Sequence, residues 1–169
     1  MSVSDDAVRA SFEALSPEER RALIVAAIQA ETGIDEAMIE RLVRAFYDRV
    51  RADALIGPVF AARIADWEPH LQQMFAFWSS VALSTGRYQG APMRKHLFLP
   101  IDSRHFDRWL ALFEATAAEV CPPRAAEHFI VRARRIAENF EMGVASVNGV
   151  MLEKGRRLHR PEIDAPAEG

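Results

Sequence analysis

Four polar aromatic side chains, each on a different predicted helix, are the residues of this sequence best suited to chemistry: Tyr47, His70, His96 and Trp109. A neutral imidazole is a common metal ligand, while a phenol and an indole donate hydrogen bonds. His96 sits among apolar residues, in a stretch bounded by two prolines. We therefore expect His96 to be either a packed core residue or a ligand held in a dry pocket.

Haem is a cofactor whose requirements match this set. It takes a neutral imidazole on one side of the iron, apolar walls around the macrocycle and few polar groups on the other side. The residues available as walls are Phe46, Phe60, Met74, Phe75, Phe77, Leu97, Phe98 and Phe113. Taken singly, each of these residues and each histidine is also compatible with ordinary core packing, and periodicity does not separate the two interpretations.

Several other kinds of site are excluded by the sequence. It contains no glycine-rich phosphate loop, no His-Glu-x-x-His zinc motif and no Gly-x-Ser-x-Gly elbow. The repeated Glu-x-x-His pattern of di-iron bundles is also missing. Cys121 is the only cysteine, so one chain forms no internal disulfide and no thiolate site for zinc or iron–sulfur clusters. No side chain is assigned a catalytic role.

The composition is that of one ordinary globular domain. The chain has 169 residues, of which 50% are hydrophobic and 27% charged, and its net charge is −3. Nucleic-acid binders usually carry a basic surface, which this balance does not suggest. The longest apolar run near the start, residues 22–28, is too short to span a bilayer and follows acidic residues. We expect a cytoplasmic protein that binds neither nucleic acids nor membranes.

Helix caps and apolar periodicity predict an all-α fold. Ser16, Asp35, Asp66 and Asp102 have the residue types of N-caps, and Gly33 that of a C-cap. The predicted helices cover residues 17–31, 36–52, 67–83, 93–98, 103–120 and 123–147, and no run alternates as a strand does.

Three regions follow from this pattern. Residues 1–33 form an N-terminal extension with one helix, and residues 34–150 form the main domain. Residues 151–169 lose helical periodicity and contain several basic side chains. We expect this last stretch to be a disordered polar tail.

The segment from about Asp35 to Ala145 resembles the truncated haemoglobins of group III. The resemblance rests on an ordered set of short matches: 46–51 (FYDRVR), 57–60 (GPVF), 67–70 (WEPH), 77–78 (FW), 88–92 (YQGAP), 95–100 (KHLFLP) and 105–113 (HFDRWLALF). The absence of a Gly-Gly pair agrees with group III. The resemblance implies a truncated globin, a short two-over-two helical sandwich, here with an extra N-terminal helix.

The resemblance also implies roles for individual residues around a haem b group. His96 corresponds to the proximal histidine that binds iron. Tyr47, His70 and Trp109 correspond to the distal residues that meet the bound ligand. Phe60, Phe77 and Met74 correspond to cofactor contacts, and Arg63, Arg94 and Lys95 are candidates to meet the propionates.

His105 is the rival for the proximal position. It lies four residues before Trp109, so both side chains share one helical face. If Trp109 faces the distal pocket, His105 is poorly placed to bind iron from the opposite side. We therefore expect a structural or surface role for His105.

The implied function is the binding of dioxygen, nitric oxide or peroxide. Donors such as Tyr47 and Trp109 each contribute about 1.5–3 kcal/mol to holding a charged acceptor. Slow ligand release favours nitric-oxide dioxygenation or peroxide reduction, with an unidentified reductase, over oxygen delivery. His70 is either a gate or a resting iron ligand, and we favour the gate. The alternative is a haem-free or haem-sensing helical interaction module of globin shape.

Overall fold

Side-chain caps set where most of the long helices begin. Ser16 and Glu19 form a reciprocal capping box, and Asp35 accepts a hydrogen bond from the Met38 amide. The computed structural model describes residues 3–164. Its helices are α1 (Val3–Glu13), α2 (Pro17–Thr32), α3 (Glu36–Ala52), α4 (Gly57–Ala61), α5 (Trp67–Leu83), α6 (Pro92–His96), α7 (Ser103–Val120) and α8 (Pro123–Val147), followed by a 3₁₀ turn, Pro161–Asp164.

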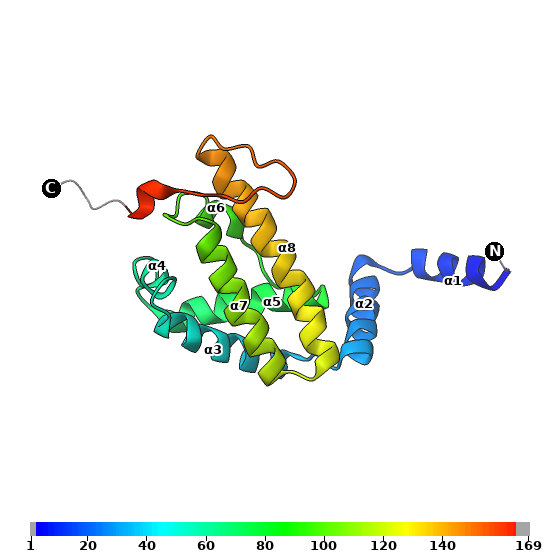
Figure 1. The fold of residues 1–169 in the computed structure, drawn as a ribbon. Coiled ribbons are helices and arrows are strands. Elements are labelled where there is room, and N and C mark those ends of the chain that lie inside the picture. Colours follow the sequence, from blue (N-terminus) through cyan, green and yellow to red (C-terminus); the bar gives the residue numbers. More distant parts are fainter. Residues whose placement is uncertain (1–2, 165–169) are drawn as a thin grey trace.

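Two pairs of helices enclose the main core. Helices α7 and α8 pack along each other, α3 packs against both α5 and α7, and the two pairs cross (Figure 1). Trp78 stacks on Phe113 with ring centroids 4.7 Å apart, and Phe46 meets Phe113 edge to face at 5.2 Å. Such aromatic contacts add to the apolar burial that drives folding. The all-α fold expected from the sequence is confirmed, in the form of two crossed pairs of helices.

The N-terminal extension contains two helices instead of the single predicted one. Helix α2 follows the prediction and ends at Gly33, whose φ of 72° is left-handed. Helix α1 precedes it and extends away from the body (Figure 1), with Val8 68% exposed. Good helix formers and an Arg9–Glu13 pair one turn apart favour this helix locally. Residues 5–13 of this helix are all exposed, so packing against the body does not define it.

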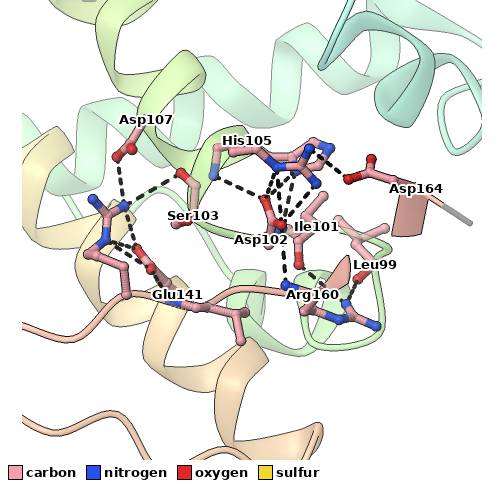
Figure 2. A network of polar contacts seen from close by, with 12 residues as sticks. Leu99, Ile101, Asp102, Ser103, His105, Asp107, Glu141, Arg160 and Asp164 are labelled. Carbon is pink, nitrogen blue, oxygen red and sulfur yellow. Dashed lines mark hydrogen bonds and ion pairs between the residues drawn. The ribbon is translucent and has the colours of Figure 1, made fainter. Parts of the chain in front are cut away.

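The C-terminal stretch also differs from the expected disordered tail. Leu158 is fully buried and packs with a second apolar cluster that includes Ile101 and Val144. Its amide donates to the buried carboxylate of Glu141 over 2.8 Å. Two of the basic residues expected to be solvated thus have partners: Arg157 pairs with Asp107 on α7 and Glu141 on α8, and Arg160 bonds to the segment between α6 and α7 (Figure 2). Residues 165–169 of that tail lie outside the described residues.

A further difference concerns residues 53–66, where the sequence predicts no helix. The structure instead has the short helix α4, with Pro58 in its first turn, where a missing N–H is tolerated. Helix α4 carries Phe60 toward α3.

None of the helices within residues 3–164 is long and apolar enough to cross a membrane.

Candidate functional site

A cavity of about 570 Å³ lies between α3, α4, α5, α7, α8 and the segment around α6. This volume is within the usual range for small-molecule and cofactor sites. Its walls contain the residues to which the resemblance gives proximal, distal and cofactor-contact roles, namely Tyr47, Phe60, His70, Met74, Phe77, His96 and Trp109. Residues from helices far apart in the chain therefore share one cavity, as the resemblance implied.

His96 is the last residue of α6, and its ring is held in one tautomer. The Nδ1 atom lies 2.6 Å from the carbonyl oxygen of Pro92. A carbonyl oxygen only accepts hydrogen bonds, so Nδ1 carries the proton and Nε2 keeps its lone pair. Burial lowers the pKa of His96, and nearby Lys95 lowers it further. The side chain is therefore a neutral imidazole with a free basic nitrogen.

Tyr47 projects from α3 and is only 5% exposed. Its ring packs edge to face against Phe60 at 5.8 Å and against His70 at 5.2 Å. Burial raises the pKa of the phenol well above its usual value. The hydroxyl therefore stays protonated at neutral pH and is available as a hydrogen-bond donor.

His70 projects from the first turns of α5 and has an unpaired nitrogen. Its Nε2 atom is buried and has no hydrogen-bond partner among the residues that the structure describes. Burial, followed by the charges of Lys95 and His96, lowers the pKa of this histidine. An unsatisfied buried polar atom costs about 1–3 kcal/mol, so a polar ligand in the cavity would be stabilising.

The opposite wall differs in part from the one expected. Trp109 stacks on Phe113. Five of the apolar residues offered as walls do not line the cavity: Phe46, Phe75 and Phe113 lie in the core, Phe98 is 79% exposed, and Leu97 lies in the turn after α6. Helix α6 ends at His96, and the chain turns before Phe98. Residues that sequence reasoning did not assign to the wall include Leu99, Ile101, Phe106 and Phe140. Phe140 packs on the His96 ring at 4.7 Å, and the sequence signal that includes it is the apolar periodicity of residues 123–147.

The remaining candidates are three basic side chains, proposed to meet the propionates, and His105. Arg63 and Lys95 line the cavity, and Arg94 does not. His105 is buried and belongs to the capping box of α7, where its Nδ1 accepts a hydrogen bond from the Asp102 amide over 3.1 Å. It also touches the cavity wall, but this bond gives it the structural role expected from the sequence.

The two cavity histidines make stability depend on pH. In the unfolded chain they take up protons as the pH falls through about 6.5, while burial keeps His70 and His96 neutral to lower pH in the folded chain. The unfolded state then binds more protons, and the free energy of unfolding falls. We expect the urea midpoint of the cofactor-free chain to drop between about pH 7.5 and pH 5.5, with a smaller drop in His70→Gln. Equal midpoints at both pH values would contradict this.

Comparisons with known proteins agree on one family. A model described as bacterial-like globin matches residues 30–141. Group 3 truncated hemoglobin ctb of Campylobacter jejuni is 34% identical over 113 residues, covering 64% of this chain and 89% of the relative. The crystal structure of the group III truncated hemoglobin from Campylobacter jejuni matches with a TM-score of 0.61 and 34% identity, over 63% of this chain and 88% of that one.

A second solved structure supports the same fold. The hemoglobin of the thermophilic phototrophic bacterium Chloroflexus aurantiacus is 28% identical, with a TM-score of 0.56 over 67% of this chain and 95% of that one. The matched family region begins just before α3 and ends within α8, so α1, most of α2 and the C-terminal stretch lie outside it. The chain belongs to the bacterial-like globins, as a truncated haemoglobin of group III.

Proposed function

We propose that this chain binds haem b in the cavity through His96 and uses it to bind dioxygen and related small ligands. Membership of the globin family supports haem-based ligand binding in general. The observation that carries the specific proposal is the bond between His96 Nδ1 and the Pro92 carbonyl. Second-shell contacts of this kind fix the tautomer and raise the basicity of metal-binding histidines.

The cavity has the properties that haem requires. Its imidazoles are held neutral, as iron coordination needs. The unpaired Nε2 of His70 marks a place where a polar group is missing a partner. Apolar side chains such as Phe60, Phe77 and Met74 supply walls for the macrocycle, and Arg63 and Lys95 are candidates for its carboxylates. These residues fit the group.

When bound, haem supplies an iron atom that coordinates small gaseous ligands. The chain contributes the surroundings of that atom. Tyr47, kept protonated by burial, is a donor toward a ligand that carries partial negative charge. Trp109 brings a second donor, its indole N–H, to the same cavity. The aromatic side chains around them exclude water, which strengthens both hydrogen bonds.

Two donors favour redox detoxification over oxygen delivery, because they slow ligand release. We propose nitric-oxide dioxygenation or peroxide reduction as the activity, with electrons from a reductase of unknown identity in the cytoplasm. His70 acts as a gate in this proposal, since its ring packs against Tyr47 and Trp67 at 5.2 and 5.6 Å without a hydrogen bond to fix Nε2.

A haemin titration of the full chain tests the proposal. We expect a Soret band that saturates at one haem per chain, a pyridine haemochrome spectrum of haem b, and nitric-oxide consumption by the reduced, oxygenated protein. Without a Soret band the chain would be a haem-free helical module, and haem binding without nitric-oxide or peroxide turnover would refute the detoxification role. A fully low-spin bis-histidine ferric spectrum at neutral pH would make His70 a resting ligand instead of a gate.

A further inference from the structure

The C-terminal residues 157–164, here called the C-terminal strap, run along the segment that joins α6 to α7 (Figure 2). The Ser103 amide donates to the carbonyl of Leu158 over 2.9 Å, and the Arg160 amide donates to the Asp102 carboxylate over 3.4 Å. The strap lies beyond the region that matches the globin family, which ends at residue 141. Its contacts therefore belong to this chain and not to the matched family core.

Arg160 connects the strap to the segment that follows His96. Its Nη1 atom donates to the carbonyls of Leu99 and Ile101, over 3.0 and 3.3 Å. Both of these residues line the cavity. The Leu99 amide in turn donates to the carbonyl of His96 over 3.2 Å. A continuous chain of hydrogen bonds thus leads from the Arg160 guanidinium to the backbone of His96.

A second connection runs through apolar packing. Leu158 is fully buried, in a cluster to which Leu99 and Phe140 also belong. Phe140 packs against the His96 ring. The strap therefore supports the histidine both through its backbone and through the ring that lies beside it.

Buried carboxylates anchor the strap at two points. Glu141 is 5% exposed and accepts from the Leu158 amide and from the Arg157 guanidinium. Asp102 is fully buried and accepts from Arg104 as well as from the Arg160 amide. A buried carboxylate left without partners is costly, which favours the docked strap over a free tail.

We propose that Arg160 is a positioning residue, through which the C-terminal strap fixes the segment 97–101 and thereby the orientation of His96. This inference rests on the proposed function, in which His96 binds the haem iron. The guanidinium suits the task because Nη1 carries two N–H groups and reaches both carbonyls, while Nε of the same rigid plane is held by Glu162 over 2.8 Å. Its side chain is 15% exposed, so water competes weakly for these bonds.

Hydrogen exchange of the full-length chain without haem tests the positioning itself. In Arg160→Gln we expect the amides of residues 97–103 to exchange roughly tenfold faster than in the wild type, because two hydrogen bonds from a charged donor are lost. Arg160→Lys should fall in between, since it keeps the charge but not the fork. Arg156→Gln is the matched control: Arg156 lies in the same stretch, is exposed, and its side chain makes no hydrogen bond to the described residues.

Haem-loaded protein supplies the second measurement. Arg160→Gln should release haem to a scavenging apoglobin several-fold faster than Arg156→Gln and show a broadened or shifted iron–histidine stretching band. Equal exchange of residues 97–103 in the two variants would overturn the proposal. An equal rise across α7 and α8 would also overturn it, because Arg160 would then stabilise the whole fold. Failure of the wild type to bind haem would refute the proposed function, while the exchange comparison would still test the positioning.

Discussion

Replacing His96 by glycine or alanine is expected to abolish haem retention, whereas replacing His105 by asparagine should leave the Soret band in place. His96 offers a neutral imidazole whose Nδ1 is occupied by the Pro92 carbonyl and whose Nε2 is free. Even second-shell partners of metal ligands contribute about 10–100-fold in affinity. Loss of the ligand itself should therefore weaken haem binding by more than about 100-fold, measured by haemin titration and by transfer to a scavenging apoglobin.

Chemical rescue separates a lost ligand from a lost fold. Free imidazole added to His96→Gly should restore the spectrum, because the ring then enters from solution into the space that the side chain leaves. The His105 variant should instead show a lower free energy of unfolding, by about 1–3 kcal/mol, since the Asp102 amide loses the acceptor that completes its cap. The assignment of His96 would be refuted if His105→Asn lost haem and His96→Gly kept it.

The helices around the cavity were predictable because their signals are local. Asp35 and Asp66 begin α3 and α5 at the predicted residues, and apolar stripes at helical spacing identify the buried faces. Tyr47 and His70 reach one cavity because their helices pack against each other. Periodicity alone does not predict that these two side chains share a cavity. That prediction came from the family resemblance.

The strap and part of the cavity wall could not be predicted in the same way. Arg160 and its acceptor Leu99 are 61 residues apart, and a basic run near a chain end has the composition of a solvated segment. Phe98 shows the opposite error, because an apolar residue beside His96 was expected in the wall and is 79% exposed. In both cases contacts between residues far apart in the sequence determine burial. Charged residues of the strap become buried through such contacts, and the apolar Phe98 stays exposed.

The cavity is asymmetric in its polar groups, and this asymmetry leads to the second large prediction. His96, the residue that we assign to the iron, lies on the side of the cavity where Phe140 packs. Its Nδ1 proton is already hydrogen-bonded to the Pro92 carbonyl. On the side of α3 and α5, His70 Nε2 is buried without a partner among the described residues, and burial alone raises the pKa of the Tyr47 hydroxyl. Unused hydrogen-bond capacity is therefore present on the side where a ligand of the iron would lie.

Tyr47→Phe should release dioxygen roughly 10–100-fold faster than the wild type, as measured by stopped-flow displacement with carbon monoxide. One hydrogen bond to a charged acceptor contributes about 1.5–3 kcal/mol, and each 1.4 kcal/mol changes a rate or equilibrium by about tenfold. The substitution removes only the hydroxyl, so the packing against Phe60 and His70 is retained. The Soret band and the thermal midpoint should stay close to those of the wild type.

Tyr88→Phe is the matched control, since Tyr88 also lines the cavity but packs against Phe77, away from the Tyr47 cluster. Trp109→Phe should accelerate release as well, and the double variant with Tyr47→Phe more than either alone if both donors meet the same ligand. If dioxygen left Tyr47→Phe and Tyr88→Phe at the same rate, the α3 tyrosine would not be the donor. The case for oxygen chemistry over delivery would then rest on Trp109, the other donor that the proposal uses, because His70 is assigned to the gate.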